Sequence, residues 1–279
     1  MPCSPGNGRR QRLPFPFFVW AWRMRAVPAK VKAMNIKSAI SLVKGCALWG
    51  LVAVITVSCA STTTDRSEAK NSPVAGGTQA LTLFNGRDFR GWKAVSADPK
   101  VPMEKVWRVQ DGIIICSGEP MGYIHTDRAF TNYRLEVEYR WAPGKEPGNS
   151  GIFGRITGEP RPLPRCIETQ LRHGNAGDLY GFHGLKINGP SERFRFVPNH
   201  QIGGDLRGVS RAAGNEKPPG QWNHVVIEAQ GPRIRVWLNG QFVNEATDAE
   251  IASGPVGLQS EGGEIHFRNI YLIPLPSTP

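Results

Sequence analysis

Carboxylate and amide side chains alternate with apolar ones in the segment Arg165-Cys-Ile-Glu-Thr-Gln-Leu171. Side chains on a β-strand point alternately to opposite faces, so Glu168 and Gln170 project together while positions 167 and 171 point the other way. A carboxylate in such a place is a candidate general base, and the amide beside it is a candidate substrate-binding group. The alternative is an edge strand whose polar face is simply solvated.

The loop after this segment is dense in polar side chains, and polar residues concentrated around one strand and loop indicate a site. His173 is a candidate base or acid, and Asp178 and His183 are candidate substrate-binding groups. An isolated histidine is more often a hydrogen-bonding residue than a metal ligand. The spacing fits no standard zinc pattern, so no cofactor is assigned, and a divalent cation stays an open alternative.

A glycine-rich segment, Gly148-Asn-Ser-Gly151, opens a second strand that continues to Arg155. Glycine lets a neighbouring backbone or a ligand approach closely. We expect Gly151 and Arg155 to share one strand face, where Arg155 pairs with Glu168 across strands or clamps a sugar oxygen. Asn149 is a candidate substrate-binding residue in this interpretation and an ordinary turn residue in the alternative.

These groups need strands to position them, and strand patterns occur along the rest of the chain. Residues 133–141 alternate five apolar or aromatic side chains with four charged ones, which predicts a strand with one buried face. Residues 233–238 and 241–243 flank Asn239-Gly240, a dipeptide that suits a type I′ turn, and predict a hairpin. Further strands are expected at 106–109, 112–116, 151–156, 165–171, 223–229, 255–259 and 264–272.

The overall pattern predicts an all-β fold, an antiparallel β-sandwich or jelly roll, because many short strands are separated by turn signals. No segment sustains a 3.6-residue apolar period for three turns. Residues 81–275 are long enough for a single domain with its own core. The sequence has neither βαβ alternation nor a dinucleotide-binding glycine fingerprint, which argues against nucleotide or nicotinamide chemistry within this chain.

Several short motifs occur in an order that resembles a known family. They are Leu83-Phe-Asn-Gly-Arg-Asp-Phe-Arg-Gly-Trp92, Gly-Asn-Ser-Gly-Ile-Phe at 148–153, Cys-Ile-Glu-Thr-Gln-Leu at 166–171, His-Gly-Asn-Ala-Gly-Asp at 173–178, Lys-Pro-Pro-Gly-Gln-Trp-Asn at 217–223, Val-Trp-Leu-Asn-Gly at 236–240, Gly-Pro-Val-Gly-Leu-Gln at 254–259 and Phe-Arg-Asn-Ile at 267–270. Together they make residues 81–275 similar to the 3-keto-disaccharide hydrolase domain family.

The resemblance implies a concanavalin A-like jelly roll that cleaves glycosides already oxidised to a ketone at C3 of the sugar. The residues that match the polar core of the family are Asn149, Arg155, Glu168, Gln170 and His173. The continuation of that core toward Asp178 varies between members.

The implied substrate changes what the site must do. An ordinary glycosidase uses two carboxyl groups, whereas here Gln170 holds the second place on the strand and cannot exchange protons. A 3-keto sugar needs less, because the ketone acidifies the C2 proton: one base can start an elimination that expels the C1 substituent, and water then adds back. We predict Glu168 as the base and His173 as the alternative base or the leaving-group acid, with Arg155, Gln170 or a cation stabilising the enolate oxygen.

A non-catalytic carbohydrate-binding module of the envelope is the main alternative, since this jelly roll serves lectins as readily as enzymes. Such a module needs exposed aromatic platforms and tolerates the loss of Glu168, whereas the enzyme does not. A conventional glycosidase or polysaccharide lyase is a third interpretation. For the enzyme, the expected partners are a 3-keto-glycoside substrate and a separate oxidoreductase that supplies the ketone.

The net charge of +11 does not indicate a nucleic-acid partner, because the excess lies at one end of the chain. Residues 1–58 contain nine of the 34 Lys and Arg residues and no Asp or Glu. The remainder has 25 basic and 23 acidic residues and is therefore almost balanced.

Residues 1–58 are interpreted as a leader with a signal peptide whose true start is Met34. Lys37 and Lys44 precede an apolar run at 45–57, which is too short for a membrane-spanning helix and is typical of a secretory signal. The run ends at Cys59 and resembles a bacterial lipoprotein signal, in which Cys59 becomes the acylated first residue. A plain signal peptide cut near 58–60 and a single-pass anchor are the alternatives.

We therefore expect a lipid-anchored protein on the periplasmic side of the cell envelope, associated with the membrane through Cys59. The polar stretch at 59–80 is interpreted as a flexible tether. Only Cys116 and Cys166 remain for the domain, and each sits in an apolar strand pattern, so we expect two buried thiols.

Overall fold

The computed structural model describes residues 79–277. The leader at 1–58 with its start at Met34, the lipidation at Cys59 and nearly all of the tether at 59–80 lie outside the described residues. These interpretations stay predictions. Within the described part of the chain, no helix is long and apolar enough to span a lipid bilayer.

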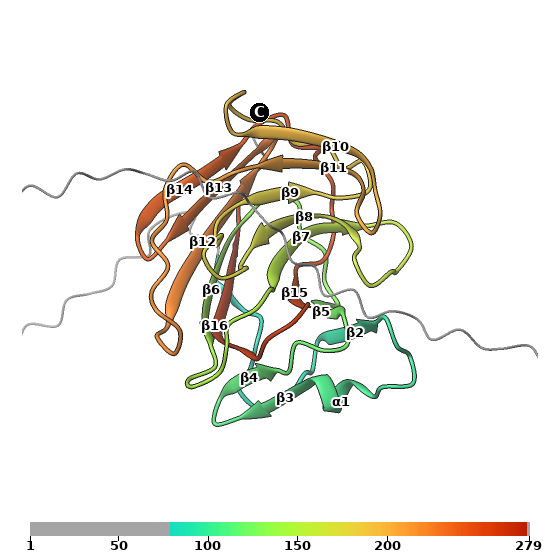
Figure 1. The fold of residues 1–279 in the computed structure, drawn as a ribbon, viewed down its shortest axis with the longest axis vertical. Helices are drawn as coiled ribbons and strands as arrows, with labels where there is room; N and C mark the ends of the chain where they lie inside the picture. Colours follow the sequence, from blue (N-terminus) through green and yellow to red (C-terminus); the bar gives the residue numbers. More distant parts are fainter. Residues whose placement is uncertain (1–78, 278–279) are drawn as a thin grey trace, which may run out of the picture. The chain divides into compact units, whose positions relative to one another are not determined.

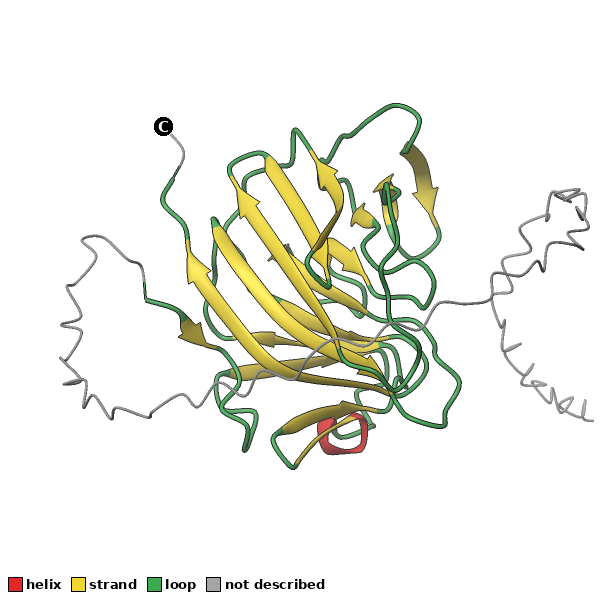
Figure 2. Ribbon diagram, turned by 90° about the vertical axis from the view of Figure 1, so that its left-hand side faces the viewer, coloured by secondary structure: helices red, strands yellow, loops and turns green. Residues whose placement is uncertain are grey.

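The described residues form two antiparallel sheets of eight strands each (Figures 1 and 2). The first sheet has the order β14-β13-β12-β6-β16-β4-β3, with β1 paired to β16. Its strands are β1 (Leu81–Thr82), β3 (Trp107–Gln110), β4 (Ile113–Cys116), β6 (Tyr133–Trp141), β12 (Asn223–Gln230), β13 (Arg233–Leu238), β14 (Gln241–Ala246) and β16 (Ile265–Pro274).

The second sheet has the order β10-β11-β9-β8-β7-β15-β5-β2. Its strands are β2 (Trp92–Ser96), β5 (Gly122–Thr126), β7 (Gly151–Thr157), β8 (Arg165–Gln170), β9 (Leu179–Gly181), β10 (Phe194–His200), β11 (Gly204–Val209) and β15 (Gly257–Ser260). A single turn of helix, α1 (Met103–Val106), precedes β3 and is red in Figure 2. The prediction of an all-β antiparallel sandwich is confirmed.

Strand β6 shows why the sequence forms this sandwich. Its apolar members are all buried and its charged members are half-buried, as the alternation predicted. The buried face packs in one cluster with Ile152 of β7 and with Ile167 and Leu171 of the β8 segment. Burying each large apolar side chain contributes about 1.5–3 kcal/mol, so this inner layer is what holds the two sheets together.

The hairpin predicted around Asn239-Gly240 is present between β13 and β14. Both turn residues have positive φ angles, 51° for Asn239 and 81° for Gly240, as a type I′ turn requires.

The two domain cysteines, Cys116 and Cys166, are buried free thiols, which confirms the prediction of two buried thiols.

Strand β8 lies in the interior of the second sheet, between β9 and β7 (Figure 1). The alternative in which residues 165–171 form a solvated edge strand is therefore wrong. Strands β2, β5, β9, β10 and β11 were not predicted.

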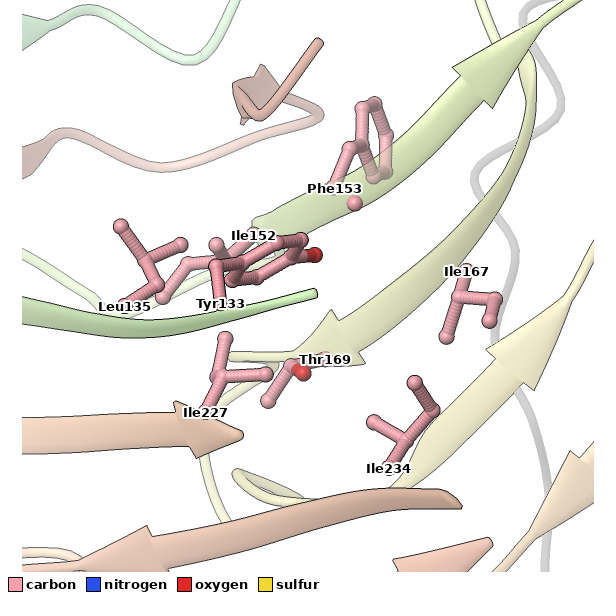
Figure 3. A pocket seen from close by; sticks show the side chains of 9 residues that line it. Tyr133, Leu135, Ile152, Phe153, Ile167, Thr169, Ile227 and Ile234 are labelled. Carbon is pink, nitrogen blue, oxygen red and sulfur yellow. The ribbon is translucent and has the colours of Figure 1, made fainter. Parts of the chain in front are cut away.

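A small cavity lies between the sheets, lined by Tyr133, Leu135, Ile152, Phe153, Gly154, Ile167, Thr169, Ile227 and Ile234 (Figure 3). Its volume is about 10 Å³, which is close to the room that one water molecule occupies. It is too small for a sugar. Because Glu168 and Gln170 alternate with Ile167 and Thr169 on β8, their side chains point to the opposite face of the sheet.

Candidate active site

The outer face of the second sheet, turned away from the first sheet, carries Glu168 at its centre. Glu168 pairs with Phe153 of β7 on one side and with Tyr180 of β9 on the other. Only 1% of the Glu168 surface is exposed. Its two neighbours on the strand, Ile167 and Thr169, face the first sheet instead. The sequence prediction that Glu168 and Gln170 share a face is consistent with this register.

Gly151 makes room for the Glu168 carboxyl. A Cβ atom at Gly151 would lie 2.1 Å from Glu168 Oε1, so the carboxyl occupies the space that a side chain at Gly151 would fill. Gly151 itself pairs with Gln170. The glycine predicted to allow close approach therefore serves Glu168 of the same chain, and it fixes where the carboxyl lies on the outer face.

The Glu168 carboxyl is buried without a partner among the described residues: no donor reaches its Oε1 atom. Burial raises the pKa of Glu168 well above the usual value, and the nearby carboxylates of Glu261 and Asp178 raise it further. A carboxyl in this environment favours its protonated form and is a candidate for exchanging a proton with a ligand.

Glu261 is a candidate site residue that the sequence analysis missed. It follows β15, where Leu258 pairs with Ile152 and thereby brings Gln259 beside Gly151. Gln259 Nε2 donates a 2.7 Å hydrogen bond to Glu261 Oε2. Burial raises the pKa of Glu261 to about 7, against the lowering effects of the Gln259 hydrogen bond and the Arg172 charge. The outer face thus holds two carboxyls with displaced pKa values.

Three buried oxygen atoms on this part of the sheet have no donor among residues 79–277. They are Asn149 Oδ1, Glu168 Oε1 and Gln259 Oε1. Asn149 lies two residues before β7 begins, and its backbone N–H donates to the Gly262 carbonyl beside Glu261. Buried acceptors are normally paired, so these oxygens are available to donors from ordered water or from a bound ligand.

In the described part of the chain, no three His, Cys, Asp or Glu side chains are arranged to hold a metal ion.

Gln170 is oriented by the backbone that follows it: its Oε1 accepts from the N–H groups of Leu171 and Arg172, at 3.0 and 2.9 Å. The Gln170 amide nitrogen is thereby left to donate toward a ligand, which fits its predicted role as a substrate-binding group.

Arg155 does not face Glu168, and the prediction that the two residues pair is wrong. The register of β7 shifts between Gly154 and Thr157, and Arg155 has a φ angle of 52°, so a β-bulge turns its side chain away from the outer face. The fully buried guanidinium donates to three backbone carbonyls instead, those of Thr131, Gly231 and Glu250. Its contacts are structural.

Replacing Arg155 by methionine is expected to lower the free energy of unfolding by about 3 kcal/mol or more, because one buried and two partly buried carbonyls lose their donor. Turnover per folded molecule should stay near normal. Urea unfolding and activity assays measure the two effects, and Arg233→Met, at an arginine whose side chain is 57% exposed, is the control. A stable but inactive Arg155→Met protein would indicate that Arg155 takes part in the reaction.

His173 is held away from the Glu168 carboxyl by a separate cluster around Glu216. Its Nδ1 lies 3.1 Å from Glu216 Oε2, which also accepts from the Gly174 N–H. The other oxygen of Glu216 accepts from Tyr139 and Trp141 of β6 in the first sheet. No contact described for His173 joins it to Glu168, so its role as base or acid stays a prediction.

Asp178 and His183 are also engaged in structural contacts. Asp178 lies near Glu168, but its Oδ1 accepts from the backbone N–H and the guanidinium of Arg211, at 2.8 and 3.3 Å. The His183 ring lies 2.9 Å from the Leu163 carbonyl, and burial lowers its pKa, which favours the neutral imidazole. Of the predicted residues, the structure brings Asn149, Glu168 and Gln170 together, with Asp178 at the border.

An antiparallel β-sandwich with a cluster of carboxyl and amide groups on one sheet face defines a concanavalin A-like jelly roll with a polar site. Residues 79–273 match the 3-keto-alpha-glucoside-1,2-lyase-like domain, and the chain belongs to that family. The family identifies a carbohydrate-cleaving type of domain and confirms the resemblance found in the sequence. No curated protein sequence matches the chain.

Solved structures show the same fold. A protein from Parabacteroides distasonis, provisionally named a glycosyl hydrolase, is 21% identical with a TM-score of 0.51, over 71% of this chain and 94% of its own. A structure from work on endo-acting O-glycanases of human gut bacteria is 15% identical with a TM-score of 0.50, over 72% of this chain and all of its own. At these identities the likeness concerns the fold alone.

Proposed function

We propose that this protein cleaves 3-keto-glycosides, including 3-keto-disaccharides, by removal of the C2 proton, elimination of the C1 substituent and rehydration. Family membership over residues 79–273 supports the substrate class. The observation that carries the proposal is the Glu168 carboxyl, buried without a donor on the outer face and beside a second carboxyl, that of Glu261. A separate oxidoreductase supplies the ketone.

The ketone at C3 is what makes this chemistry accessible to such a site. It acidifies the C2–H bond, so a carboxylate suffices as the base. The electron pair of that bond moves toward C3, and the amide nitrogen of Gln170 is available to stabilise the oxygen that becomes negative. The unpaired oxygens of Asn149 and Gln259 are available to accept from sugar hydroxyls.

A non-catalytic binding module explains this arrangement less well. A buried carboxyl without a donor costs stability, and a carbohydrate-binding surface has no need to retain one. Proteins keep such groups where a displaced pKa is used in a reaction.

The purified protein is expected to release a free sugar from a 3-keto-disaccharide and nothing from the unoxidised parent. When the reaction runs in deuterium oxide, the 3-keto product should carry deuterium at C2, because the elimination exchanges that proton with solvent. Product release and deuterium content are measured by mass spectrometry. Cleavage of the unoxidised parent without an added oxidant, or no cleavage of either sugar, would contradict the proposed function.

A further inference from the structure

Glu261 lies close enough to Glu168 to raise the pKa of its carboxyl, but the two residues have different surroundings, and that difference assigns them different tasks. Glu168 is 1% exposed, and its Oε1 meets no donor in the described structure. Glu261 is partly exposed, accepts from Gln259 Nε2 at 2.7 Å and has the Arg172 guanidinium nearby. When the pair holds one proton, Glu168 therefore carries it and Glu261 is ionised, since hydrogen bonds and positive charge favour the carboxylate form.

We propose that Glu261 is the base that removes the C2 proton and that Glu168 is the acid that protonates the leaving group. This inference rests on the proposed function and deepens it by adding a second catalytic carboxyl. It also reverses the role that the strand pattern alone predicted for Glu168. On β8 the position beside Glu168 is held by Gln170, which cannot exchange protons. The second carboxyl of the pair comes instead from Glu261, which follows β15.

The proton balance of the cycle closes with these two groups. In the elimination, the Glu261 carboxylate takes the C2 proton, the C1–O bond breaks with its electron pair going to the leaving oxygen, and the Glu168 carboxyl donates its proton to that oxygen. In the rehydration, the Glu168 carboxylate takes a proton from the water that attacks C1, and Glu261 returns its proton to C2. Both residues regain their starting states, and the net reaction consumes one water molecule.

Glu261 is fixed well enough for this task. Ser150 Oγ donates to the Gln259 carbonyl at 2.8 Å, and Ser260 Oγ donates to the Pro120 carbonyl at 3.0 Å, so the backbone that leads to Glu261 is tied on both sides. The Asn149 N–H donates to the Gly262 carbonyl just beyond it. A carboxylate on an ordered strand end, oriented by the Gln259 amide, meets the geometric need of a general base.

The charged groups around the pair support the same order of ionisation. Glu168 faces the carboxylates of Glu261 and Asp178, which both favour its neutral form. Glu261 faces Arg172 and the Gln259 amide, which both favour its ionised form, and its pKa lies at about 7. We expect kcat/KM to rise with pH through a value near 7 and to fall again at higher pH, since the pair is active with one proton.

Leaving-group dependence separates the two roles. The purified wild-type, Glu168→Gln and Glu261→Gln proteins are assayed with a 3-keto-disaccharide and with 4-nitrophenyl 3-keto-glucoside, whose phenolate leaves without protonation. Glu168→Gln should lose about 10²–10⁴-fold on the disaccharide and recover most of that loss on the aryl glycoside. Glu261→Gln should lose a similar factor on both substrates. Glu245→Gln, in a loosely paired carboxylate on β14, is the control for the substitution itself.

Each other outcome has a clear meaning. If Glu261→Gln recovers on the aryl glycoside and Glu168→Gln does not, the roles are reversed and our assignment is wrong. If Glu261→Gln is as active as the wild type on both substrates, Glu261 is not catalytic. If the wild type itself cleaves neither substrate, the proposed function fails, and the role of Glu261 fails with it. Thermal midpoints of all variants show that the proteins compared are folded.

Discussion

Replacing Glu168 by glutamine is expected to lower kcat/KM for a 3-keto-disaccharide by about 10²–10⁴-fold and, at the same time, to stabilise the protein at alkaline pH. The loss of activity follows because an amide cannot exchange the proton that the reaction needs. Both effects have one cause, the burial of a carboxyl without a donor on the outer face. Turnover and thermal midpoint are measured on the same preparations.

The stability effect has a definite sign. The pKa of Glu168 is higher in the folded than in the unfolded chain, so above the usual glutamate range the native state binds the extra proton. The wild type therefore loses stability as the pH rises from the unfolded toward the folded pKa, by up to about 1.4 kcal/mol per pH unit. Glutamine has no proton to lose, so the advantage of Glu168→Gln should grow with pH and vanish in acid.

A thermal midpoint that falls in Glu168→Gln at every pH, with activity retained, would mean that the carboxylate is needed for structure alone. The control is Glu245→Gln, which replaces a carboxylate on β14 whose side chain is 30% exposed and should change neither quantity beyond small surface effects. The former structural alternative, a Glu168–Arg155 pair, is already excluded by the contacts of Arg155 with backbone carbonyls.

Sequence periodicity predicted those parts of the site that depend on one strand. The alternation in 165–171 placed Glu168 and Gln170 on one face and the apolar residues on the other, and the structure has this arrangement. The same kind of pattern predicted β6 and the β13–β14 hairpin. Period-two patterns are reliable there because one face of each strand is buried.

The parts that depend on distant pairing could not be predicted in this way. Glu261 reaches Glu168 only because β15 pairs with β7, and the residues near 261 carry no local signal of that neighbour. Arg155 was misplaced because a bulge inserts a residue and reverses the alternation. Strand β10 was missed because its residues are largely exposed and include Pro198, so no apolar period marks it.

Replacing Gly151 by alanine is expected to lower kcat/KM by about 10²-fold while leaving the protein folded. The new Cβ would lie 2.1 Å from Glu168 Oε1 and 2.8 Å from its Cδ, so the carboxyl must move away from the space where it meets the substrate. A displacement of about 1 Å at a reacting group costs on this order. The fold tolerates the change because the atoms that must yield, Oε1, Cδ and Cγ, all belong to the Glu168 side chain and none to the backbone, and because alanine suits a strand interior better than glycine.

Gly214→Ala is the matched control, because its Cβ would make only an ordinary contact, 3.4 Å from Arg211 Nε. We expect it to keep wild-type activity. The free energy of unfolding of Gly151→Ala should change by no more than about 1 kcal/mol. The loss of activity is then not a loss of folded protein, and the thermal midpoint checks this. Full activity in Gly151→Ala would show that the position of the Glu168 carboxyl over Gly151 does not matter for the reaction.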